Sequence, residues 1–496
     1  MLSLWDEVLP IEVRELPEDL ARIDALLADP GLLAPIRAHW DGEAGVSGRS
    51  AVGHGRPTIA MATYVRLMVI KQRSGWGYET LVREVSDSLH LRRFCLIAID
   101  RRVPDESTIR KLTRRLGHET VDEITRLVIG KAQRETRFVG RAVRVDSTVI
   151  EADIRYPSDA MLALQGTRAL AREGRKLAGL VKRATVRVRD RSRSVGRTVR
   201  QISKTLARRT GQAKQQVIDL NTRAGSEIAK SAREARRLAG QARRAARGRG
   251  AQAKLRAAAK LEQLASRCEK LAEQISRRAR GLKITDRLVS ISDPDARPIR
   301  KGKLGKPTEF GYVAQIAEVT ENTRRGARGF ILPAATRPGN PAENTLLPDT
   351  IAELDRLEIT PREIVCDGGF QAGPTLETVP DATSVFISGR HEPGTRRTRK
   401  RQARYRTGIE GRISHLKRGH GLRRSRLKGH DGQQTNTGWG DPHLQPRHAR
   451  HPDRLTPSPT PGPHRPGTRQ HRDGRASPRA RPLSFRSSPP PIIRGK

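Results

Sequence analysis

A short basic segment around residue 410 combines a carboxylate with two cations at helical spacing. In RYRTGIEGRISHLKR, Glu410 follows Arg406 by four residues and precedes Lys417 by seven. A helix of about 3.6 residues per turn places these three side chains on one face. A carboxylate that can hold a metal ion would then lie beside two cations that can hold phosphates. The pattern predicts a site that cuts or joins nucleic acid.

Two further acids have positions that suit the same chemistry. Asp146 in VRVDSTVIEAD and Asp367 in EIVCDGGF each follow a β-branched run, which predicts an acid on a strand or at its end. Mg²⁺ prefers oxygen ligands, so three carboxylates from different parts of a fold can hold two ions roughly 3.5 to 4 Å apart. We predict that Asp146, Asp367 and Glu410 are catalytic and bind two Mg²⁺ ions, with Mn²⁺ as a substitute.

The cations and glycines near these acids have roles in the same prediction. Arg406 and Lys417 would contact DNA phosphates beside the scissile bond, Arg with a bidentate fork and Lys as a point charge. Gly368 and Gly369 would let the backbone approach the substrate closely.

Each of these residues also has an ordinary structural explanation. An aspartate at a strand end usually belongs to a turn, and Asp367 with the two glycines after it would form a tight turn without any ligand. An Arg and a Glu four residues apart are usually a surface pair on a helix. The joint occurrence in a strongly basic chain is what favours the catalytic interpretation.

The composition indicates a polyanionic partner. The 496 residues include 97 Lys and Arg against 53 Asp and Glu, a formal charge of +44, which exceeds what solubility requires. No stretch approaches the roughly 18 apolar residues of a membrane span, and the N-terminus lacks the features of a signal peptide. We therefore expect a soluble intracellular protein that binds nucleic acid. Three scattered cysteines, Cys95, Cys268 and Cys366, fit neither a zinc knuckle nor a disulfide framework.

Residues 1–140 are predicted to form a helical N-terminal domain. Apolar residues recur at spacings of three and four, and Asp105 or Ser107 is placed to cap a helix. Helical bundles of this size often bind DNA, and an oligomerisation or packing domain explains the same pattern. The segments with this periodicity are TIAMATYVRLMVIKQ, GYETLVREVSDSLHLRRFCL and STIRKLTRRLGHETVDEITRLVIGKAQ.

Next, an α/β domain interrupted by a basic helical insertion is predicted. The first part is 141–165, with a strand around Asp146, and the second part is 285–440. The second part has strand candidates in FGYVAQIAEVT, GFILPAAT, REIVCD and SVFISG and ends with the helix that carries Glu410.

The insertion at 166–284 is rich in cations and has coiled-coil spacing. Within it, 171–280 carries 32 Lys and Arg against 8 Asp and Glu and no proline. We predict a coiled-coil hairpin that turns near Gly248 and Gly250 and contacts DNA, although a solvated charged helix without a ligand has the same composition. The expected seams are Val199, Leu206, Ala213 and Leu220, and Leu261, Leu264, Cys268, Leu271 and Ile275.

Residues 441–496 change character abruptly. They hold 13 of the 31 prolines and 12 basic residues against 3 acids, and no core can form from them, so a disordered tail is expected. Codon degeneracy permits DPHLQPRHARHP to be read as ILTYNLDTLAI when the frame moves by one base. We therefore hypothesise a frameshift near Gly440 that replaced a native C-terminal helix and impairs folding or activity.

The chain resembles the DDE transposases of bacterial insertion sequences over roughly residues 40 to 440. In that family the signature near the last acid is Tyr, two residues, Arg, three residues, Glu, six residues, Lys. Arg406, Glu410 and Lys417 match it, whereas position 403 is Ala and the tyrosine is Tyr405. The resemblance rests on VDSTVIEADIRYPSD, DPDARPIRKGK followed by EFGYVAQIAE, VCDGGF, and RTGIEGRISHLKRGHGLRRSRLKGHDG.

The resemblance implies an RNase H-like catalytic domain in which Asp146, Asp367 and Glu410 form the metal-binding triad. Such an enzyme hydrolyses the ends of its element to free a 3′-hydroxyl that attacks target DNA. It also implies double-stranded DNA as the partner, with terminal inverted repeats at the element ends, a homo-oligomer, and a cytoplasmic protein associated with the bacterial nucleoid. A non-catalytic basic DNA-binding protein and an RNase H-like nuclease are the alternatives.

Overall fold

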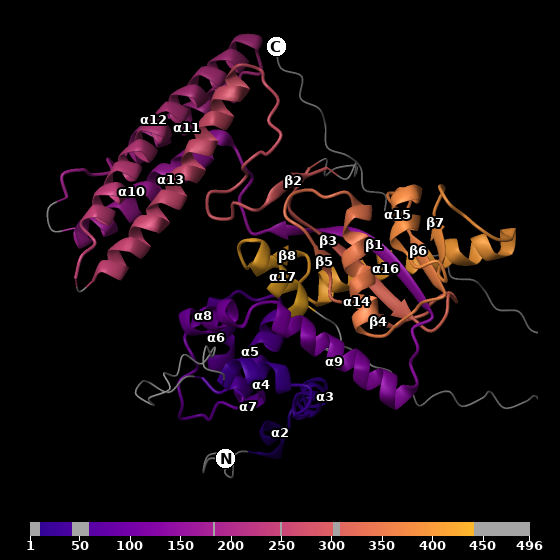
Figure 1. The fold of residues 1–496 in the computed structure, drawn as a ribbon. Coiled ribbons are helices and arrows are strands. Elements are labelled where there is room, and N and C mark those ends of the chain that lie inside the picture. The colour runs from indigo at the N-terminus through magenta and orange to yellow at the C-terminus, as the bar shows by residue number, and fades with distance from the viewer. Residues whose placement is uncertain (1–9, 42–58, 182–183, 249, 301–307, 441–496) are drawn as a thin grey trace, which may run out of the picture. The chain divides into compact units, whose positions relative to one another are not determined.

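The structure is a computed structural model that describes residues 10–41, 59–181, 184–248, 250–300 and 308–440 (Figure 1). These residues belong to one compact unit, Met1–Arg447. The expected tail at 441–496 and the hypothesised frameshift after Gly440 lie outside the described residues. None of the described helices combines the length and apolar composition that a membrane span requires.

The N-terminal region is helical, as its periodicity predicts. Asp105 caps one of the helices by accepting hydrogen bonds from the backbone N–H groups of Ser107 and Thr108. The helices share one apolar core. They are α2 (Ile11–Arg14), α3 (Glu18–Leu27), α4 (Ala34–Asp41), α5 (Met61–Ser74), α6 (Tyr78–Asp87), α7 (Leu89–Phe94), α8 (Glu106–Leu116) and α9 (Glu119–Thr136).

A mixed β-sheet carries the predicted acids. Its order is β2-β3-β1-β6-β7, in which β1 is antiparallel to β3 and parallel to β6, and β6 is parallel to β7. The strands are β1 (Ala142–Ala152), β2 (Arg297–Ile299), β3 (Glu309–Thr320), β4 (Phe330–Ile331), β5 (Ala335–Thr336), β6 (Glu363–Cys366), β7 (Ser384–Ile387) and β8 (Arg424–Ser425). The predicted strand in GFILPAAT is split into β4 and β5, because Pro333 lies between them and cannot donate to a ladder.

Helices pack around this sheet, and α16 is the one that carries Glu410. α16 contacts β1, β3 and β6, and its apolar side chains, among them Ile409 and Leu416, are buried against the sheet. The helices of this part are a 3₁₀ turn at Glu343–Leu346, α14 (Leu347–Arg356), α15 (Ala372–Thr378), α16 (Arg396–Gly419) and α17 (His430–Trp439).

The last described helix, α17, belongs to the N-terminal core. Trp439 is buried there and meets the ring of Tyr64 edge-on, with ring centroids 6.2 Å apart. Leu427, in the turn before α17, is part of the same apolar cluster. Residues near 430 therefore complete a core that begins with α3.

The insertion between β1 and β2 forms a bundle of four helices, which Figure 1 shows side by side. They are α10 (Asp159–Leu180), α11 (Ser192–Leu206), α12 (Gly211–Arg244) and α13 (Ala251–Ala279). The core is rich in alanine, which lets the helix axes come close. The predicted turn is present between α12 and α13, where Gly248 and Gly250 have φ of 64° and 92°.

The predicted two-helix hairpin is therefore wrong in its number of helices, and one predicted seam is interrupted. α11 ends at Leu206, which is 56% exposed, so the heptad from Val199 to Leu220 crosses a helix break. A seven-residue repeat sets which face is apolar but does not fix where the chain turns. The second seam lies on α13, where its residues are buried except for the partly buried Leu264.

The close helix packing predicts opposite effects for two Gly→Ala substitutions in α10. An alanine Cβ at Gly166 would lie 2.5 Å from Ile228 Cδ1 and 3.0 Å from Cys268 Sγ, whereas one at Gly179 would meet nothing within 4 Å. We expect Gly166→Ala to lower the free energy of unfolding by about 1–3 kcal/mol, from overpacking. Gly179→Ala should raise it by up to about 1 kcal/mol, through helix propensity. Urea denaturation followed by circular dichroism measures both, and equal effects would contradict this packing.

Candidate active site

The sheet register brings two of the predicted acids together. The last pair of the parallel ladder between β1 and β6 is Val145 with Cys366. Asp146 and Asp367 are the next residue on each strand, so they lie on neighbouring strands at the same level of the sheet. Both acids also lie near the Cys366 thiol. Burial raises the pKa of this thiol, and the negative charges of Asp146 and Asp367 raise it further.

Glu410 joins these two acids at one cavity. The cavity has a volume of about 820 Å³, and Asp146, Asp367 and Glu410 all line it. Glu410 reaches it from α16, and its side chain is 58% exposed. The three acids predicted from separate segments therefore face a common space large enough for a phosphodiester and its neighbours.

Arg406 and Lys417 are held by protein groups at this cavity. Arg406 Nη1 lies 3.4 Å from Asp367 Oδ1 and 3.1 Å from Glu410 Oε1, so it joins two of the acids. The ammonium of Lys417, which lines the cavity, donates a hydrogen bond of 2.8 Å to the Val149 carbonyl. Phosphate contact by either residue stays a prediction.

A fourth acid, Glu343, lines the same cavity and was missed from the sequence. Its charge also raises the pKa of the Cys366 thiol. The buried Gln315 of β3 fixes its backbone: the amide donates to the Glu343 carbonyl at 2.9 Å and accepts from the Thr350 hydroxyl at 2.7 Å. Glu343 follows a turn-rich segment with no periodicity, so the sequence gives no signal for it. Its place in the site becomes visible only in the folded chain, where Gln315 of β3 contacts its backbone.

Gly369 makes room for this fourth acid. A Cβ at Gly369 would overlap the Glu343 carboxylate. Gly369 thus serves close packing inside the cavity, whereas a Cβ at Gly368 would lie 2.8 Å from the Ser388 carbonyl oxygen. Close approach of the substrate to these two glycines stays a prediction.

Glu318, near the end of β3, fixes α16 on the sheet. Its carboxylate is fully buried and lies 2.5 Å from Arg144 Nη2 of β1 and 2.9 Å from Arg412 Nε of α16. Arg144 also donates to the Tyr405 carbonyl at 3.1 Å. One buried carboxylate therefore ties the strand of Asp146 to the helix of Glu410.

Gly408 and Tyr405 fit the same contact. A Cβ at Gly408 would overlap the Arg144 guanidinium, so a glycine is needed where the arginine passes α16. The Tyr405 ring lies under the same guanidinium, 4.9 Å from it, and its hydroxyl is 2.6 Å from the Thr320 hydroxyl. The displaced tyrosine of the signature therefore packs against the sheet and is buried.

The donor set suits Mg²⁺, because the cavity offers four carboxylates from separate elements and Mg²⁺ prefers oxygen ligands. As the side chains stand, the described residues contain no group of three His, Cys, Asp or Glu close enough to hold one ion. Arg406 bridges Asp367 and Glu410. The residue types fit the metal.

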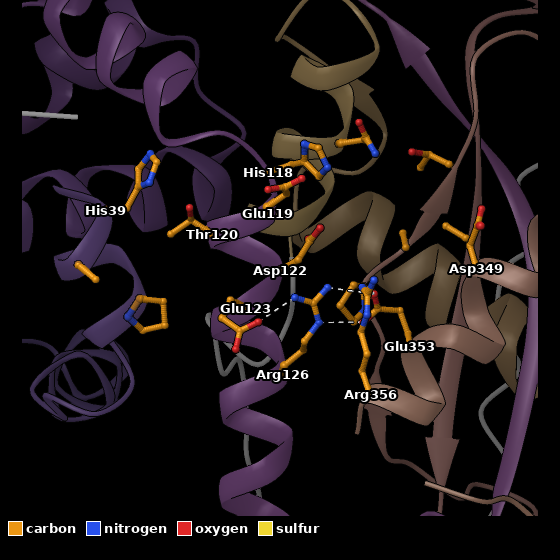
Figure 2. A pocket seen from close by; sticks show the side chains of 17 residues that line it. His39, His118, Glu119, Thr120, Asp122, Glu123, Arg126, Asp349, Glu353 and Arg356 are labelled. Carbon is orange, nitrogen blue, oxygen red and sulfur yellow. Dashed lines mark hydrogen bonds and ion pairs between the residues drawn. The ribbon is translucent and has the colours of Figure 1, made fainter. Parts of the chain in front are cut away.

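A cavity of similar size, about 810 Å³, lies between α9 and α14. Figure 2 shows Arg126 of α9 pointing to Glu123 and Glu353. Two nitrogens of Arg126 lie 2.9 Å from the two carboxylate oxygens of Glu353, and Arg356 pairs with the same carboxylate at 2.6 Å. This network joins the N-terminal helices to the sheet region, and Glu123 and Glu353 thereby have partners within the protein.

The buried position of Glu318 predicts a large loss of stability on its neutralisation. Glu318→Gln leaves the buried Arg144 and the partly buried Arg412 without their carboxylate and should lower the free energy of unfolding by about 3–5 kcal/mol. Glu84→Gln is the control, because its pair with Arg83 is exposed and worth about 1 kcal/mol or less. Urea denaturation of both variants tests this, and similar losses would contradict the central role of Glu318.

Comparison with known families agrees with this geometry. Residues 19–115 match the Transposase domain (DUF772), and residues 295–438 match the Transposase DDE domain. The second range contains Glu343, Asp367 and Glu410, whereas Asp146 lies before the helical insertion and outside both ranges. No curated protein and no solved structure matches the chain. The two consecutive transposase matches support a DDE transposase of an insertion sequence.

Proposed function

We propose that the protein cleaves DNA at the ends of an insertion sequence and joins those ends to target DNA in a metal-dependent reaction. The observation that carries the proposal is the meeting of Asp146, Asp367 and Glu410 at one cavity. The mixed sheet, with acids on β1, after β6 and on α16, supports an RNase H-like catalytic domain.

The proposed chemistry has two steps. In the first, a water oxygen attacks phosphorus at the element end, the bond from phosphorus to the 3′-oxygen breaks, and that oxygen takes up a proton. In the second, this 3′-hydroxyl attacks a target phosphodiester, loses its proton and releases a new 3′-hydroxyl on the target strand. Two bound Mg²⁺ ions would activate the attacking oxygen and stabilise charge on the leaving one.

The residues of the chain have distinct parts in this proposal. Asp146, Asp367 and Glu410 would hold the ions, and Glu343, which lines the same cavity, would complete the carboxylate set. Arg406 bridges Asp367 and Glu410 and would be free to contact a substrate phosphate once ions were bound to these acids. Lys417, fixed by the Val149 carbonyl, neutralises the neighbouring phosphate.

The excess positive charge of the helical bundle supports DNA as the partner. The same charge would also suit a protein that only binds DNA and does not cleave it. Several of its acids are already paired across helices, such as Glu234 with Arg191 at 2.5 Å and Glu269 with Arg236 at 2.5 Å. The remaining excess of arginine and lysine is available to phosphates. A protein that only coats DNA would bind equally well without metal, whereas cleavage requires both metal and acids.

Cleavage of DNA with the termini of the element tests the proposal. We expect nicking at the termini with Mg²⁺ and none with EDTA. Glu410→Gln should reduce nicking by at least about a hundredfold, because a metal-holding carboxylate is lost. Glu377→Gln, an exposed glutamate of α15 away from the cavity, should behave as wild type. Binding without Mg²⁺-dependent nicking in the wild type would contradict the catalytic proposal and favour a DNA-coating protein.

Glu343 offers a finer prediction on the same reaction. If it supports the ions, Glu343→Gln should raise the Mg²⁺ concentration for half-maximal nicking by about tenfold. DNA affinity in EDTA should stay unchanged, because the acid faces the ions and not the phosphates. Mg²⁺ titrations of nicking for wild type and variant measure this, and an unchanged Mg²⁺ dependence would assign Glu343 a packing role over Gly369.

A further inference from the structure

A smaller cavity next to the active site is lined by cations without acids. It has a volume of about 410 Å³ and lies between the end of α5 and the chain that follows α16. No acidic side chain of the described residues lines it. Its basic lining residues are Lys71, Arg73, Lys417, Arg418, Arg423, Arg424 and Arg426.

Most of these cations have no carboxylate partner among the described residues. Arg73 pairs with Asp19, and Arg424 pairs with Glu151 at 3.1 Å. The remaining arginines, Arg418, Arg423 and Arg426, are exposed and form no ion pair within the described part of the chain. The cavity therefore carries a local excess of positive charge that the protein itself does not neutralise.

Lys71 is the member that points most strongly to an anionic ligand. Its side chain is 2% exposed, and its only partner on the described residues is the ring of Tyr78, 4.9 Å from the ammonium. Burial, and the charge of Arg426 beside it, lower the pKa of Lys71 to about 8. Burying an ammonium without a carboxylate partner is unfavourable in free energy. An anion bound in the cavity would pair with the Lys71 ammonium and reduce this penalty.

Helix dipoles offer a competing explanation for part of the cluster. Lys71 and Arg73 lie in the last turn of α5, and Lys417 and Arg418 in that of α16, where cations are favourable. That effect operates at exposed positions and does not require burial. It also leaves Arg423 and Arg426 unexplained, because both follow the end of α16.

The basic cavity adjoins the catalytic one. Lys417 lines both, so its side chain forms part of the wall that they share. A DNA strand whose scissile phosphate lies beside Asp146 and Glu410 would bring its neighbouring phosphates past Lys417. Arginine forks and a buried ammonium are suited to these phosphates.

We propose that this cavity, formed jointly by the N-terminal helix α5 and the segment 417–426, binds backbone phosphates of the DNA strand that runs through the active site. The inference rests on the proposed function, because it takes the substrate strand from there. It assigns the N-terminal region a direct contact with the strand being cut. Lys71 provides the buried charge of the site. The guanidinium groups of Arg418, Arg423 and Arg426 provide its exposed hydrogen-bond donors.

Two buried cations on α5 provide a matched test. Arg66 is 5% exposed and pairs with Asp24 at 2.6 Å, whereas Lys71 has no carboxylate. We expect Lys71→Met to raise the melting temperature and to weaken DNA binding by about five- to tenfold. The slope of log affinity against log salt should fall by about one, as for one lost phosphate contact. Arg66→Met should lower the melting temperature and leave that slope unchanged.

The probe is a fluorescein-labelled DNA duplex of about 30 base pairs in EDTA, titrated by anisotropy at several KCl concentrations. Two exposed residues provide a second pair that does not affect the core: Arg426→Gln lowers the salt slope, and Lys428→Gln, outside the cavity, does not. A Lys71→Met protein that is more stable and binds DNA with the wild-type slope overturns the inference. An Arg426→Gln protein that binds DNA with the wild-type salt slope overturns the role of the exposed arginines.

The outcomes separate this inference from the proposed function. Wild-type protein that binds the duplex and nicks element ends, with Lys71→Met equal to it in affinity and slope, overturns the phosphate cavity alone. Wild-type protein that does not bind DNA overturns both. An effect of Lys71→Met that appears with an RNA duplex of the same length and not with DNA overturns the assignment to the DNA strand.

Discussion

The active site depends on one buried carboxylate. Glu318 lies near the end of β3 and contacts the buried Arg144 of β1 and the partly buried Arg412 of α16. A charge placed there requires its partners in fixed positions, because a buried ion without them is strongly unfavourable. The position of α16, and with it Glu410, follows from this requirement. Gly408 allows the Arg144 guanidinium to reach the helix backbone.

The positive charge of Arg406 holds two acids of the site in place and also competes with a metal ion for them. Arg406 holds Asp367 and Glu410 near each other without an ion, which reduces the repulsion between acids that share a cavity. Two divalent ions would take over that role and release the arginine for a phosphate. The cationic cavity beyond Lys417 would behave in the same way, since a bound polyanion would balance its excess positive charge.

Local signals in the sequence predicted much of this site. β-branched runs indicated the strand that contains Asp146 and the strand that ends before Asp367, and helical spacing indicated the face that carries Arg406 and Glu410. Contacts between distant segments were not predictable. Arg144 and Glu318 are 174 residues apart and belong to strands that read as ordinary apolar runs. Glu343 follows a turn, and Trp439 ends a polar helix without apolar periodicity, so their places appear only in the folded chain. The bundle differed from the predicted hairpin because heptads do not specify where helices end.

Binding of Mn²⁺ followed by electron paramagnetic resonance tests the central claim most directly, since it needs neither the element ends nor turnover. Three variants, Asp146→Asn, Asp367→Asn and Glu410→Gln, each remove one acid from a different element while the fold is checked by circular dichroism. A single shared site predicts that every one of them weakens the same bound Mn²⁺ signal. A folded variant that keeps the full wild-type signal would show that its acid does not belong to the metal site and would contradict the account.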